Sequence, residues 1–127
     1  MIREGSSEKN LDALLPLVTD KTYKRCLFVV DDRSCVDLLR DGDIDGVVRK
    51  AIKLGLDPVR AIQLATINPA EYFRQQEVGA VAPGYMADLI VLSDLSQLPI
   101  EMVFYRGHLV AREGSPYSPP LRLPAED

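Results

Sequence analysis

The sequence contains no tryptophan, one histidine and two cysteines, and aromatic residues make up 6% of its 127 residues. Cys26 and Cys35 do not form a C-x-x-C pair, which argues against a zinc knuckle or a thioredoxin-type site. We expect both thiols to be buried and reduced. The single histidine, His108, falls in a predicted turn, and we expect it to be an exposed polar side chain and not a metal ligand.

Long apolar runs and an excess of positive charge are missing as well. No apolar stretch approaches the ~20 residues that a membrane span needs, and no hydrophobic segment of the signal-peptide kind follows the basic residue Arg3. The formal net charge of -4 lacks the basic footprint of a protein that binds phosphate backbones. These features predict a cytoplasmic protein with no nucleic acid or membrane among its partners.

What the chain does contain is the material for one folded domain. Hydrophobic residues make up 46% and charged residues 27%, a balance that supports a buried core and argues against disorder. Residues 1–6 are predicted to be extended, and the apolar run 25–30 is typical of a strand in a parallel sheet. Between them, apolar residues at helical spacing predict a helix that ends or kinks near Pro16.

Helix signals dominate residues 43–73. Asp43 is the expected N-cap of a first helix that ends at Gly55. The pairs Asp57-Pro58 and Asn68-Pro69 each combine a capping residue with a proline at the first helical position. They predict two further helix starts.

The chain changes character after Gln76. A tight turn is predicted at residues 106–108, and the tail 115–127 is rich in proline and expected to be extended or disordered. Strands are predicted at residues 87–92, 100–105 and 109–112. The whole is an α/β chain, but two parallel strands cannot bury both their faces without neighbours, so the sequence indicates a piece of something larger.

Two carboxylates, Asp31 and Asp32, directly follow the predicted strand 25–30. They therefore lie at the carboxyl end of a strand, where α/β folds collect catalytic and ligand-binding groups. Either carboxylate can instead cap a helix that begins near Ser34. Taken alone, each of them fits the capping role better than the functional one.

Four segments together resemble one family: Met1–Ser6, Val30–Arg33, Gly55–Phe73 and Gly79–Leu92. They include an A-T-x-N-P-A pattern and a G-x-x-x-P-G-x-x-A-D-L-x-V-L pattern, which occur widely across the amidohydrolase superfamily. The Arg-Glu-Gly-Ser opening and the Asp-Asp-Arg triplet point more narrowly to adenine deaminase. The chain, up to about Gly114, thus resembles the C-terminal part of bacterial adenine deaminases.

The resemblance implies a fold and a reaction. Residues 1–76 would be the last two βα units of a TIM-like barrel, with residues 1–6 and 25–30 as its strands seven and eight. Residues 77–114 would be an antiparallel β unit, part of a β-sandwich, followed by the proline-rich tail 115–127. The family hydrolyses adenine to hypoxanthine and ammonia with a divalent metal, which is manganese, iron or zinc.

The resemblance also reverses the interpretation of Asp31. In the family, a carboxylate after strand eight binds metal and accepts a proton from the attacking water. Asp31 matches that position best, as the first residue past the apolar run, and Asp32 is the alternative. Arg3 and Glu4 lie at the end of the other strand, where they either contact substrate or form an ion pair that closes the barrel rim.

The other metal ligands of the family, an H-x-H pair, a bridging carboxylate and two further histidines, have no counterpart in this sequence. A catalytic metal takes about three protein ligands or more, so we expect the isolated chain to hold no metal and to be inactive. It would need the N-terminal part of such an enzyme as partner. The alternative is a non-catalytic remnant that serves as an assembly or binding module. Exposed apolar edges predict self-association into a homo-oligomer.

Overall fold

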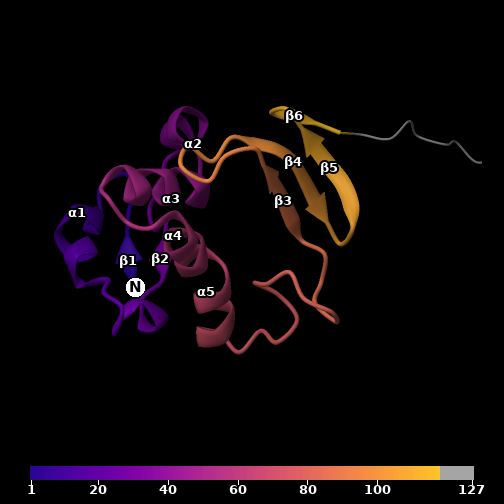
Figure 1. Ribbon diagram of the computed structural model, residues 1–127. Helices are drawn as coiled ribbons and strands as arrows, with labels where there is room; N and C mark the ends of the chain where they lie inside the picture. The colour runs from indigo at the N-terminus through magenta and orange to yellow at the C-terminus, as the bar shows by residue number, and fades with distance from the viewer. Residues whose placement is uncertain (118–127) are drawn as a thin grey trace, which may run out of the picture.

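The computed structural model describes residues 1–117 and has an α/β architecture (Figure 1). A helical unit packs against two short strands, and a four-stranded antiparallel meander follows it. The tail from residue 118 onward, which includes most of the predicted proline-rich segment, lies outside the described residues. Among residues 1–117, no helix is both long and apolar enough to cross a membrane.

The helical unit is built on two strands, β1 (Ile2–Arg3) and β2 (Phe28–Val29), which pair in parallel. Ile2 lies opposite Phe28 and Arg3 opposite Val29, so the predicted parallel arrangement is confirmed. The second strand is shorter than the apolar run suggested, because the 3-10 turn η2 (Tyr23–Arg25) takes its first residue. Within the described part of the chain, the two strands pair only with each other.

The connection between the strands contains a short helix, α1 (Leu11–Leu14), which continues into the 3-10 turn η1 (Leu15–Leu17). Pro16 lies in the first turn of η1, so the α-helix ends where the proline was expected to end it.

Helix α2 (Cys35–Asp41) begins at Ser34, whose side chain accepts the backbone N–H of Asp37. The capping role considered for Asp31 and Asp32 is therefore wrong, since the helix starts too far along the chain for either to reach its amides. The expectation of two buried cysteines is also wrong, because Cys35 is exposed at the start of α2.

Three helices follow: α3 (Ile44–Lys53), α4 (Pro58–Ala65) and α5 (Ile67–Tyr72). Asp57 caps α4 by accepting the N–H of Arg60, with Pro58 at the first helical position, as predicted. Asp43 occupies the N-cap position of α3, also as predicted. Gly55 follows Leu54, the C-cap of α3, with a left-handed φ of 99°, a conformation that glycine adopts without strain.

The predicted cap at Asn68 is wrong, because α5 begins one residue earlier and Asn68 lies inside it. The Asn68 side chain is buried, and its Nδ2 donates to the carbonyl oxygens of Tyr23 and Cys26, each at 2.7 Å. This amide therefore fastens α5 to the segment that leads into β2.

The core forms where α1, α3 and α4 pack on one face of the β1–β2 pair (Figure 1). Ile2 and Phe28 point into it, and its largest fully buried side chains are Leu11, Val47 and Leu64. Because alternate residues of a strand face opposite ways, Arg3 and Val29 lie on the other face of the pair.

The meander runs through β3 (Leu89–Leu92), β4 (Ile100–Tyr105), β5 (His108–Arg112) and β6 (Ser115–Pro116). These strands pair in chain order, all antiparallel. The sheet therefore continues past Gly114, where the β unit was predicted to end, because Ser115 and Pro116 pair with β5. His108 is exposed at the start of β5, beside the predicted turn.

Both tight turns of the meander have the same geometry. Arg106 and Gly107 have φ values of 49° and 79°, and Glu113 and Gly114 have 49° and 75°. Two successive left-handed residues define the type I′ turn, whose twist matches that of the strands it joins. Between the meander and helices α3 and α4 lies an apolar cleft of about 780 Å³, lined by side chains that include Ile44, Val48, Ile62, Leu89, Val103 and Phe104.

Candidate functional site

The site begins with the loop that follows β1, residues 4–9, which we call the strand-end loop. Glu4 and Lys9 form an antiparallel bridge, and the Gly5 N–H donates to the Glu8 carbonyl at 2.9 Å. Asn10 then holds both polar groups of the Arg3 backbone, at 2.7 Å and 3.0 Å. The chain thus folds back on itself directly after the strand. The two hydrogen bonds with Asn10 fix the position of the Arg3 backbone, from which its side chain extends.

Arg3 and Asp31, two predicted site residues from separate strands, lie side by side in the folded chain. Arg3 Nη1 lies 3.5 Å from Asp31 Oδ2, and Arg3 Nη2 lies 3.5 Å from Glu8 Oε2. The Arg3 and Asp31 side chains are 44% and 36% exposed. They lie at the carboxyl end of the strand pair, where both side chains are partly exposed.

Asp32 points elsewhere. Its carboxylate accepts the backbone N–H of Ser7 at 3.1 Å and that of Glu8 at 3.3 Å, both in the strand-end loop. Desolvation raises the pKa of Asp32, but these hydrogen bonds outweigh it and hold the pKa below its ordinary value. The Asp32 carboxylate therefore accepts backbone hydrogen bonds from the strand-end loop, whereas the Asp31 carboxylate pairs with a side chain.

Glu4 lies on the helix side of β1. Its side chain is 6% exposed, and Oε1 lies 2.7 Å from Lys50 Nζ on α3. Lys50 also lies 2.6 Å from Asp12 Oδ2. Desolvation lowers the pKa of Lys50, but the hydrogen bonds with Asp12 and Glu4 outweigh it and raise that pKa above its ordinary value. Glu4 thus pairs with Lys50, whereas Arg3 pairs with Asp31 and Glu8. A substrate contact by either residue stays a prediction.

Arg33 has a structural role that the sequence did not predict, although the residue belongs to the Asp-Asp-Arg triplet. Its Nη2 donates to the Glu4 carbonyl at 3.0 Å, and its Nη1 donates to the carbonyls of Gly42 and Asp43. The position of Arg33 directly after two strand-end carboxylates could have indicated this role, because a guanidinium has enough donors to bind several carbonyl oxygens.

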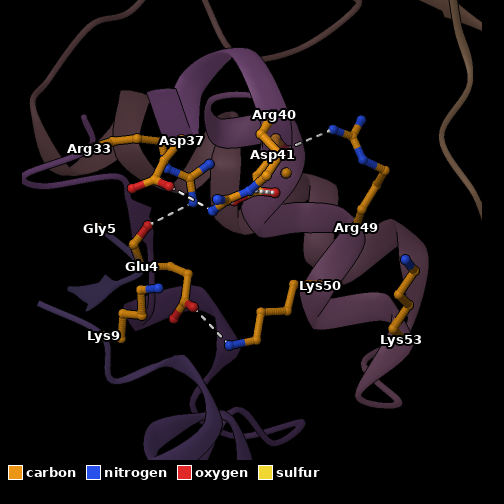
Figure 2. Close-up of a pocket in the computed structure, with 11 residues that line it drawn as sticks. Glu4, Gly5, Lys9, Arg33, Asp37, Arg40, Asp41, Arg49, Lys50 and Lys53 are labelled. Carbon is orange, nitrogen blue, oxygen red and sulfur yellow. Dashed lines mark hydrogen bonds and ion pairs between the residues drawn. The ribbon is translucent and has the colours of Figure 1, made fainter. Parts of the chain in front are cut away.

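A polar pocket of about 410 Å³ lies beside Glu4 and Arg33 (Figure 2). Its other lining side chains come mainly from α2 and α3, and they include Arg40, Arg49, Lys50 and Lys53. Asp31 does not line it, since the pocket opens on the helix side of the strands. Most of its charges are already neutralised, as the ion pairs of Arg40 with Asp37 and of Lys50 with Glu4 show.

The residues present do not fit a complete metal site. Within residues 1–117, no group of three or more histidine, cysteine or acidic side chains is placed to hold a metal ion. Asp31 offers one carboxylate with a guanidinium as its neighbour, whereas a catalytic metal takes about three protein ligands or more.

Comparison with known proteins defines the class. Residues 2–110 match the model of the Amidohydrolase family, so the chain belongs to that family. Amidohydrolases are generally metal-dependent hydrolases. A solved amidohydrolase from Thermotoga maritima MSB8 is similar at 20% identity and a TM-score of 0.46, over 80% of this chain and 35% of that one. This score is too low to establish a barrel for this chain.

Curated relatives narrow the resemblance to adenine deaminases. The adenine deaminase of Dehalococcoides mccartyi strain 195 is 77% identical over 114 residues, which is 90% of this chain and 20% of the relative. The adenine deaminase of Oceanobacillus iheyensis is 54% identical over 114 residues, with the same coverage. The resemblance to part of an adenine deaminase is thereby confirmed, and the chain spans about a fifth of the length of these relatives.

Proposed function

We propose that this chain is the part of an adenine-deaminase-type hydrolase that supplies Asp31 to a catalytic site completed by residues outside this sequence. The observation that supports the proposal is the different engagement of the two strand-end carboxylates. Asp32 accepts two backbone amides, whereas the Asp31 carboxylate is 36% exposed and pairs with the Arg3 guanidinium.

In this proposal β1 and β2 are strands seven and eight of a TIM-like barrel. Residues 1–76 belong to the barrel, and residues 77–114 belong to a β-sandwich. The parallel pairing of β1 with β2 supports this arrangement. Support also comes from the incomplete burial of Arg3 and Val29, because parallel strands are normally covered on both faces.

The proposed reaction replaces the amino group of adenine by oxygen and releases ammonia. Asp31 accepts a proton from the attacking water and returns it to the departing nitrogen, a role that suits a carboxylate at a strand end. Arg3, 3.5 Å from Asp31, either contacts the purine or serves only as the ion-pair partner of the Asp31 carboxylate. A divalent metal held by residues outside this sequence would supply the activated water.

The proposal is tested in a chimera in which this chain replaces the matching fifth of the Dehalococcoides mccartyi relative. We expect the chimera to release ammonia from adenine and the chain alone to release none. Asp31→Asn should lower kcat of the chimera by about 10²–10⁴-fold, the usual contribution of a general base. Asparagine also tolerates the left-handed φ of 53° at this position.

The matched control is Asp20→Asn, which removes an 81% exposed carboxylate remote from the strand ends and should leave kcat unchanged. A folded chimera without activity, or an Asp31→Asn chimera with full activity, contradicts the proposal. If Asp32→Asn abolishes activity and Asp31→Asn does not, the two carboxylates exchange roles.

A non-catalytic assembly module is the second candidate. The apolar cleft of about 780 Å³ between the meander and helices α3 and α4 favours it, because an apolar surface of this kind is usually covered. Ammonia release by the chimera would decide for the catalytic proposal.

A further inference from the structure

Asp32 follows Asp31 in the chain but binds a different part of the molecule. Its carboxylate accepts the amides of Ser7 and Glu8, at 3.1 Å and 3.3 Å, and so reaches across from the end of β2 to the loop after β1. The Asp32 carboxylate is therefore the group that joins the two strand ends.

The contact leaves no free space on the loop side. A methyl group added to Gly5 would overlap Asp32 Oδ1 and would lie 3.0 Å from both the Asp32 nitrogen and the Val30 carbonyl oxygen. Only a residue without a Cβ lets the loop approach this closely. The separation between the strand-end loop and the turn at Asp31 is thus set by direct contact.

The same loop also reaches Asp31 from the other side. Glu8 gives its backbone N–H to Asp32 and its carboxylate to Arg3, and Arg3 in turn lies 3.5 Å from the Asp31 carboxylate. The chain closes this ring, because Asp31 and Asp32 are consecutive. Asp31 itself has a left-handed φ of 53°, a conformation that few residues other than glycine, asparagine and aspartate adopt. Surrounding contacts help to hold a residue in this conformation.

We propose that Asp32 is a positioning residue, whose hydrogen bonds to the strand-end loop hold the Asp31 backbone in its left-handed conformation and so set the direction of the Asp31 carboxylate. The inference rests on the proposed function of Asp31. It gives Asp32 a role other than that of an alternative ligand. It also explains why Gly5 is the residue that lies against it.

The test uses Asp32→Ala, with Asp32→Asn as a milder variant that keeps one amide oxygen as acceptor. In the chimera, we expect Asp32→Ala to lower kcat about 10–100-fold, the range that a misplaced catalytic group produces. KM should change by less than about threefold, because the substitution removes no interaction that binds the substrate equally in the ground state and the transition state. In the full 127-residue chain, amide hydrogen exchange of Ser7 and Glu8 should quicken about tenfold, because each loses a hydrogen bond.

The matched control is Asp94→Ala. Asp94 also accepts two backbone amides, those of Ser96 and Gln97, each at 2.7 Å, in a loop before β4. Its removal should quicken exchange of those two amides and leave kcat unchanged. Gly5→Ala should lower kcat as Asp32→Ala does. The double variant should lose less than the product of the two losses, because the clashing oxygen is gone.

Two outcomes overturn the inference. A fall in kcat without faster exchange of Ser7 and Glu8 means that Asp32 acts on the reacting groups directly. Faster exchange with unchanged kcat means that the loop does not position Asp31. If the unsubstituted chimera is inactive, the proposed function fails instead. The positioning is then decided in the chain alone, by the three-bond coupling between the amide and α protons of Asp31, which Asp32→Ala must change.

Discussion

Lys50 Nζ lies 2.7 Å from Glu4 Oε1 in a pair whose carboxylate side chain is 6% exposed. The same ammonium lies 2.6 Å from Asp12 Oδ2, so a single lysine on α3 binds the end of β1 and helix α1. Among residues 1–117, the second Glu4 oxygen is buried without a hydrogen-bond partner. Glu4 therefore depends on Lys50 for its charge compensation.

Replacing Lys50 with methionine should destabilise the fold by about 2 kcal/mol. Removing one partner of a buried ion pair costs about 3–5 kcal/mol because the other charge is left uncompensated, and the 37% exposure of Lys50 reduces that loss. The control is Lys53→Met on the same helix, an exposed side chain whose loss should cost less than about 0.5 kcal/mol. Urea denaturation measures both, and equal losses would show that the Glu4 pair contributes nothing.

Acid should weaken the contact between α2 and the strand-end loop through Asp37. Hydrogen bonds from the Ser6 and Ser34 hydroxyls lower the pKa of Asp37 below its ordinary 3.8. A carboxyl with a lowered pKa in the folded state stabilises that state above pH 3.8, and the stabilisation is lost as the pH falls through the lower folded-state pKa. Unfolding free energies measured below pH 3.8 should therefore fall less steeply in Asp37→Asn than in the unsubstituted chain. Identical slopes would rule out this contribution.

The buried amide of Asn68 should be essential to the packing of α5. Asn68→Ala leaves two carbonyl oxygens without their donor, and we expect a loss of about 2–3 kcal/mol. Asn68→Asp should cost more, because it sets a carboxylate oxygen against carbonyl oxygens. Gln75→Ala removes an exposed amide just past the same helix and serves as the control. Thermal unfolding that ranks Gln75→Ala level with Asn68→Ala would contradict this prediction.

The isolated chain should self-associate. Its apolar cleft of about 780 Å³ and the edges of the two-stranded β1–β2 sheet are surfaces that an assembled enzyme would cover. Light scattering coupled to size-exclusion chromatography should give a mass above that of one chain. In the chimera the cleft should be covered, so the oligomers that form through the cleft should be absent. A well-folded monomer across the accessible concentration range would count against this expectation.

Local signals in the sequence predicted much of the fold. The Asp57-Pro58 pair specifies a helix start through one side chain and its near neighbours, so no knowledge of the tertiary structure is needed. The turn at Arg106-Gly107 is equally local, since its geometry depends on two adjacent φ angles. The parallel pairing of the strands followed from the unbroken apolar run 25–30, because such runs suit strands that are buried on both faces.

The errors arose where distant groups decide the outcome. Asn68 precedes a proline and is a residue type that often caps helices. Its side-chain amide nevertheless donates to two carbonyl oxygens more than forty residues earlier in the chain. The division of labour between Asp31 and Asp32 depends on amides in the loop after β1, which no spacing within the triplet specifies. The Glu4–Lys50 pair was likewise unpredictable, because it joins a strand and a helix that meet only in the folded chain.

The two type I′ turns restrict how this chain can change in length. Each joins its strands through a two-residue link, Arg106-Gly107 or Glu113-Gly114, so one inserted residue would turn every later side chain of the strand to the opposite face. Insertions and deletions are therefore tolerated best in the connections before β3 and between β3 and β4. Tags, linkers or labels intended for this protein belong in those connections, where added residues leave the register of the hairpins intact.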